Sequence, residues 1–193
     1  GRARAAAVNH VLVAHRMGRI GADVICSTDF FGPGVTDALL GRRVFEPAVR
    51  GGVILFPGEP DVPHSYTYVR DFGRAMVAIG GEAGSFGEIW HVPPATTRTN
   101  RAVIEAIIEA GGQDATCQFI PGWAEKLSDF FNRTSREQQE TTYLRRQPWI
   151  VRAERLRQRF GFEPTPLDEA IGATLEWYRA QSTARLERSG ARV

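Results

Sequence analysis

A short apolar segment near the start of the chain, "ADVICST" at residues 22–28, restricts the fold more than any other feature. It contains β-branched residues, follows a helix-like stretch and ends in residues that favour turns. A strand that is apolar on both faces is typical of a parallel sheet covered by helices. The segment therefore predicts a buried parallel strand within an α/β fold.

Helix-like and strand-like segments alternate along the rest of the chain. Helices are predicted in seven segments: residues 3–18, 35–49, 71–80, 103–110, 123–146, 152–160 and 165–179. Asp71 and Thr165 each stand where a residue can cap the helix that follows. Short extended segments are predicted at "GGVILF", "SYTYV", "EIWHV" and "ATCQFIP". We find no internal repeat and no linker that would divide the chain into two independent domains.

The glycines of "GEAGSFG", residues 81–87, have the spacing of a variant nucleotide-binding loop. Such a loop needs a strand before it and a helix after it, because only then do the helix amides point at a pyrophosphate. Here the order is inverted, since a predicted helix precedes the glycines and a predicted strand follows them. The segment is therefore interpreted as a helix end and a turn.

The charge pattern excludes several classes of partner. The formal net charge is +2, and all of the 24 basic residues except Lys126 are arginines. These arginines alternate with acids and form no stripe, which argues against nucleic-acid binding. No apolar run approaches the roughly 18 residues of a membrane span, and no signal peptide is evident. We therefore expect a soluble, cytoplasmic protein with reduced thiols at Cys26 and Cys117.

No metal site is expected. His10 and His15 are five residues apart and do not share a helix face well, and His91 on a predicted strand is interpreted as packed or solvated. The four tryptophans are interpreted as core or lobe-packing aromatics. They are Trp90, Trp123, Trp149 and Trp177.

Four segments in order resemble the C-terminal half of an extended short-chain dehydrogenase/reductase, the NAD-dependent epimerase/dehydratase family. They are "ICSTDFFGPG", "PGEPDVPHSYTYVRD", "GEIWHVPPATTRTNRAVIEAI" and "FGFEPTPLDEAIGATLEWY". The resemblance covers residues 1–180 and implies the last strands of a Rossmann-like parallel sheet with a small mixed α/β substrate-binding lobe. Residues 181–193, which lack an apolar stripe, are expected to be a frayed tail.

In this family the N-terminal half supplies the glycine loop and a catalytic Tyr-x-x-x-Lys pair. Neither is present, since Lys126 has Gly122 four positions before it. The resemblance therefore implies NAD or NADP as cofactor of the full-length family member, no catalytic residue here, and no oxidoreductase activity of this chain alone. Two interpretations stay open: a fragment of an epimerase, dehydratase or reductase, or a non-catalytic ligand-sensing or interaction module. Relatives often dimerise, so a homodimer is also compatible.

The resemblance also implies site residues. Ser27 and Thr28 would lie beside the nicotinamide as cofactor-binding residues, and Asp29 would face a small-molecule substrate. The alternative is that residues 27–29 simply cap the turn before the Gly-Pro pair. His64 is expected to bind substrate at a position where sugar-nucleotide enzymes commonly carry an arginine that clasps a phosphate. Histidine is a weaker, pH-dependent substitute, which favours a smaller or uncharged substrate.

Overall fold

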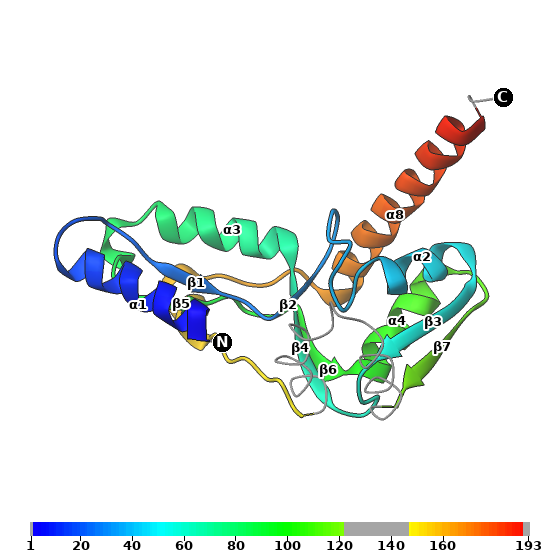
Figure 1. Cartoon of the computed structure of the whole chain (residues 1–193), viewed down its shortest axis with the longest axis horizontal. Helices are drawn as coiled ribbons and strands as arrows, with labels where there is room; N and C mark the ends of the chain where they lie inside the picture. The colour runs from blue at the N-terminus through cyan, green and yellow to red at the C-terminus, as the bar shows by residue number, and fades with distance from the viewer. Residues whose placement is uncertain (1, 122–146, 191–193) are drawn as a thin grey trace.

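The computed structural model describes residues 2–121 and 147–190, which form two adjoining lobes joined by a central sheet (Figure 1). The helix expected at residues 123–146 lies outside the described residues. No helix within the described part of the chain is long and apolar enough to cross a membrane.

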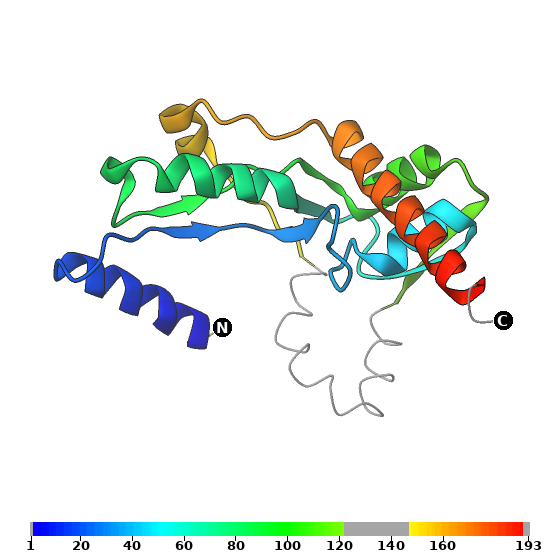
Figure 2. The same cartoon turned by 90° about the horizontal axis from the view of Figure 1, so that it is seen from above.

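The first lobe is built on a short parallel sheet. Its elements are α1 (Arg2–Arg16), β1 (Val24–Cys26), α3 (Val69–Gly80), β5 (Ile89–His91) and α7 (Glu154–Phe160). Strand β1 pairs in parallel with β5, which confirms the direction predicted from its sequence. Helices α1 and α3 lie on either side of this sheet (Figure 1), and α7 lies against β5, away from β1 (Figure 2).

The β1 side chains are half-buried rather than buried, which corrects the expectation of full burial. The reason is that β1 pairs only with β5 among the described residues, so its other edge has no strand beside it. The core of this lobe lies instead where α3 and α7 meet β5. Ile79, Trp90 and Leu156 are almost fully buried there.

The second lobe holds the larger core. Its elements are α2 (Arg42–Arg50), β3 (Gly52–Pro57), α4 (Asn100–Gly111), β7 (Ala115–Ile120) and α8 (Leu167–Gly190). Strands β3 and β7 are parallel, and alternate β3 side chains such as Ile54 and Phe56 are buried under α2, α4 and α8. Thr99 caps α4, because its Oγ1 accepts a hydrogen bond of 3.2 Å from the Ala102 amide.

The central sheet joins the lobes. It contains β2 (Asp29–Phe31), β4 (Pro63–Tyr68) and β6 (Thr96–Thr99). Strand β4 lies in the middle, parallel to β2 and antiparallel to β6. Strand β6 was not expected from the sequence, because its run of threonines and an arginine carries no apolar alternation. Helix α8 continues to Gly190, past the position where a frayed tail was predicted to start.

Asp71 does not cap α3, which corrects the sequence prediction. The helix begins at Val69 after Tyr68, so Asp71 is the third helical residue, and its side chain is fully buried. Its carboxylate accepts hydrogen bonds from the Thr165 amide at 2.8 Å, from the Thr165 hydroxyl at 2.7 Å and from Arg74 at 2.8 Å. Thr165 lies two residues before α8, so Asp71 ties the first lobe to the second.

Candidate functional site

A cleft of about 720 Å³ lies between the central sheet and the α2–β3 side of the second lobe. Ser27, Thr28 and Asp29 line it where the chain passes from β1 to β2. Arg42 and Arg43 of α2 line the opposite wall. A smaller cavity of about 400 Å³ between α2 and α8 contains none of the residues that the sequence predicts as site residues.

Strand register explains why Asp29, His64 and Trp149 belong to one wall of the cleft. Asp29 is opposite Tyr66 in the β2–β4 pair, and Trp149 forms an isolated parallel bridge with His64. Paired residues in a sheet project to the same face, and so do residues two apart along a strand. Asp29, His64, Tyr66 and Trp149 therefore share one face, the face that is turned toward the second lobe.

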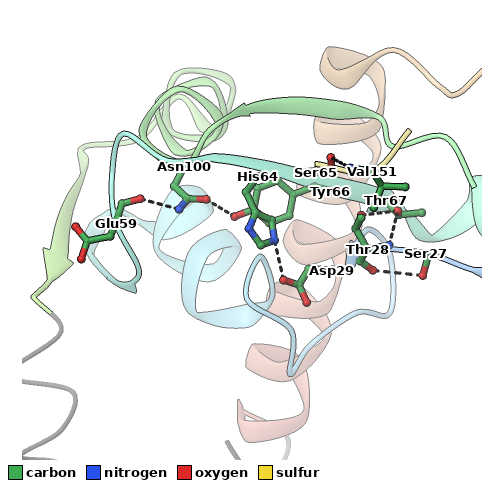
Figure 3. A network of polar contacts seen from close by, with 10 residues as sticks. All are labelled: Ser27, Thr28, Asp29, Glu59, His64, Ser65, Tyr66, Thr67, Asn100 and Val151. Atoms are coloured by element: carbon green, nitrogen blue, oxygen red, sulfur yellow. Dashed lines mark hydrogen bonds and ion pairs between the residues drawn. The ribbon is translucent and has the colours of Figure 1, made fainter. Parts of the chain in front are cut away.

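Asp29 and His64 are joined directly. The His64 Nε2 and Asp29 Oδ2 atoms are 2.8 Å apart, which fits the tautomer with the proton on Nε2 donating to the carboxylate (Figure 3). The His64 side chain is only 1% exposed, whereas that of Asp29 is 47% exposed. His64 Nδ1 is buried and has no hydrogen-bond partner in residues 2–121 and 147–190. The Asp29 carboxylate is thus exposed in the cleft, and the buried His64 imidazole donates a hydrogen bond to it.

Tyr66 fixes the other side of the imidazole. The two ring centroids are 4.6 Å apart, and the Tyr66 hydroxyl donates to Asn100 Oδ1 at 2.6 Å. Asn100 Nδ2 in turn donates to the Glu59 carbonyl at 2.8 Å (Figure 3). Burial, with a smaller contribution from the Asp29 carboxylate, raises the pKa of Tyr66 far above its usual range.

The folded chain should lose stability at alkaline pH because of its buried phenols. Burial raises the pKa of Tyr178 to about 12, and its hydroxyl donates to the Val35 carbonyl at 2.8 Å. In the unfolded chain tyrosine titrates near pH 10, so this stability is complete below about pH 10 and is lost as the pH rises toward 12. We expect the urea midpoint to decrease as the pH is raised from about 9.5 to about 11.5, because this range spans the tyrosine pKa of the unfolded chain. A midpoint that is unchanged over this range would contradict the prediction, and Tyr178→Phe should reduce the fall.

Ser27 and Thr28 are held at the carboxyl end of β1. The Thr28 amide donates to Thr67 Oγ1 at 3.2 Å, and the two threonine hydroxyls are 2.7 Å apart (Figure 3). Ser27 Oγ donates to the Thr28 carbonyl at 3.3 Å. The structure thus brings Ser27, Thr28 and Asp29 to one rim of the cleft and places His64 behind Asp29.

Arg42, Arg43 and Trp149 are among the cleft residues that sequence reasoning missed. Arg42 and Arg43 were not distinguished from the other arginines, although they lie together on the polar side of a short amphipathic helix. Trp149 was interpreted as a packing aromatic, because no local pattern connects it with His64. Its position depends on a strand contact across more than 80 residues of chain, which a periodicity analysis does not detect.

No protein-family model matches the chain, and a search of curated proteins finds no match. Solved structures do match, and they define the class of fold: that of NAD-dependent epimerases and dehydratases, over about half the length of those proteins. This confirms the α/β fold expected from the sequence. The sequence identity is 15–18% for these matches, so the likeness concerns the fold.

Three of these structures illustrate the match. dTDP-glucose 4,6-dehydratase from Bacillus anthracis, in complex with NAD, has a TM-score of 0.64 and 18% identity, over 88% of this chain and 48% of that one. UDP-glucuronic acid 4-epimerase from Bacillus cereus, in complex with NAD, has a TM-score of 0.65 and 16% identity, over 89% and 47%. RMD from Pseudomonas aeruginosa, complexed with NADPH, has a TM-score of 0.64 and 16% identity, over 91% and 53%.

Proposed function

We propose that this chain is the substrate-binding portion of an NAD(P)-dependent epimerase/dehydratase-like oxidoreductase that acts on a small or sugar-like alcohol or carbonyl compound. The observation that carries the proposal is the position of the cleft. It opens beside the carboxyl end of the parallel strand β1, which is where open α/β sheets bind their ligands. The NAD and NADPH complexes among structures of the same fold support it.

Each residue at the rim has a role in this proposal. Ser27 and Thr28 would hold the nicotinamide end of the cofactor, and their fit rests on their place in the cleft at the end of β1. The cofactor would supply a hydride acceptor or donor there. Asp29 would accept a hydrogen bond from a substrate hydroxyl, and His64 would act on substrate through Asp29. The residues present include no Tyr-x-x-x-Lys pair, so residues 1–193 alone are expected to transfer no hydride.

The proposal is tested on the complete product of the gene that encodes this chain. The codons upstream of Gly1 are expected to encode, in frame, a strand, a glycine-rich loop and a Tyr-x-x-x-Lys pair. The complete product should then bind NADH or NADPH in a fluorescence titration, and residues 1–193 alone should show no NAD(P)-linked turnover. A stop codon with a start codon close to Gly1, together with no cofactor binding, would favour the non-catalytic module instead.

A further inference from the structure

The cleft wall beside the central sheet contains an aromatic side chain, Trp149, that packs in neither hydrophobic core. Trp90 is buried in the first core, and Trp177 packs against the second. Trp149 belongs to neither cluster, and it lines the cleft. Building on the proposed function, we propose that Trp149 contacts the ligand and that His64 is a positioning residue that holds the Asp29 carboxylate beside it. This wall would then take an uncharged, hydroxyl-bearing ring rather than a phosphate.

Backbone pairing holds Trp149 in this place. Its amide donates to the Pro63 carbonyl at 3.0 Å, and its carbonyl accepts from the Ser65 amide at 2.8 Å. The Val151 amide donates to Ser65 Oγ at 3.1 Å, which holds the segment a second time, two residues after Trp149. Backbone groups of successive strand residues point to opposite edges. The Tyr66 carbonyl accepts from the Ala95 amide on one edge of β4, so Pro63 and Ser65 bond to Trp149 on the other edge, which is the edge that β2 occupies further along the strand. Trp149 and Asp29 therefore follow one another along one edge of β4.

The Asp29 carboxylate is prepared to accept a hydrogen bond from a ligand. One oxygen, Oδ2, accepts from His64, and the other has no hydrogen-bond partner among residues 2–121 and 147–190. No arginine in those ranges lies within ion-pairing distance of Asp29. An ionised carboxylate is an acceptor only, so it attracts hydroxyl groups and repels phosphate.

The rest of the cleft carries the opposite charge. Arg4, Arg42 and Arg43 line it, against the two carboxylates of Asp29 and Asp37. This excess of positive charge disfavours a cationic ligand, although an ammonium group would otherwise suit an aromatic ring beside a carboxylate. The combination that remains for the β4 wall is an uncharged ring, with its apolar face on the indole and a hydroxyl donating to Asp29.

The test uses the complete gene product and the methyl pyranosides of glucose, galactose, mannose and xylose as uncharged ring probes. Binding is followed by saturation-transfer NMR and by tryptophan fluorescence. We expect at least one pyranoside to bind, inorganic phosphate not to compete with it, and Trp149→Ala and Asp29→Ala each to weaken binding about tenfold or more, which is about 1.4 kcal/mol. Trp177→Phe is the matched control and should leave binding unchanged.

His64 is tested by replacement and rescue. His64→Phe keeps a ring against Tyr66 but removes the donor to Asp29, and it should weaken pyranoside binding about tenfold. His64→Gln restores a donor and should recover most of the affinity, with both variants melting at similar temperatures. If His64 only packed against its neighbours, His64→Phe would bind the pyranoside at least as well as His64→Gln.

The inference is overturned if no pyranoside binds, if phosphate competes with the pyranoside, or if Trp149→Ala binds as the unaltered protein does. Titration with NADH and NADPH on the same samples separates the two proposals. A product that binds pyranoside but no dinucleotide would refute the proposed oxidoreductase and leave the ring subsite standing. A product that binds dinucleotide but no pyranoside would refute the ring subsite and leave the proposed oxidoreductase standing.

Discussion

Asp71→Ala is expected to lower the free energy of unfolding by about 3 kcal/mol, because two hydrogen-bond donors of Thr165 lose a charged acceptor. The Asp71 side chain is fully buried, so water does not replace the missing carboxylate without rearrangement. For a chain of this size the change corresponds to a melting temperature lower by about 10 °C. Circular dichroism melts and urea titrations of the purified variant measure it.

Asp61→Ala is the matched control for this variant. Asp61 also forms an ion pair with an arginine, Arg101, at 2.9 Å, but the two side chains are 73% and 46% exposed to solvent. Exposed ion pairs contribute little to stability, so the control should melt close to the unaltered chain. Equal losses in the two variants would show that burial and the bonds to Thr165 are not the cause.

Gly111→Ala should also destabilise the chain, by about 1–3 kcal/mol, as insertions of a methyl group into packed cores do. Gly111 ends α4 where this helix crosses α2, and a Cβ atom built there would overlap the carbonyl oxygen of Ala48. Either the two helices separate or the α2 backbone shifts, and both responses disturb the second core. The urea midpoint should fall accordingly.

A second glycine in a helix provides the comparison. Gly73 lies within α3, and a Cβ atom added there meets no other atom within 4 Å. Gly73→Ala is therefore expected to stabilise the chain by about 0.5–1 kcal/mol, because alanine loses less backbone entropy than glycine in a helix. Opposite signs for the two substitutions would confirm that space, rather than helix propensity, decides the effect at Gly111.

Local rules predicted much of the fold. The parallel direction of β1 follows from apolar residues on both of its faces, and Thr99 at the start of α4 follows from cap chemistry. The end of α7 at Gly161 follows from the left-handed conformation of that glycine. Each of these features depends on residues within one turn or one strand, so the sequence pattern contains the information.

Features that depend on distant contacts were not predictable in this way. Asp71 has the sequence position of a cap, but its partner is Thr165, 94 residues away. His64 and Asp29 were expected at the same site, yet only the register of β2 on β4 indicates that they bond to one another. The role of Trp149 depends in the same way on its bridge to β4. The assignments of Ser27, Thr28, Asp29 and His64 to cofactor and substrate stay predictions.

The bond between Asp71 and Thr165 has a consequence for the engineering of this protein. One wall of the cleft belongs to the central sheet and the other to α2. The contact between the two lobes includes the hydrogen bonds from Thr165 to the Asp71 carboxylate, which lies outside the cleft. Substitutions around this joint, for example Thr165→Ser or Thr165→Val, would change the span between the walls without altering any group that a ligand touches. Directed evolution toward bulkier ligands can therefore begin at the contact between Asp71 and Thr165, with the residues that line the rim of the cleft unchanged.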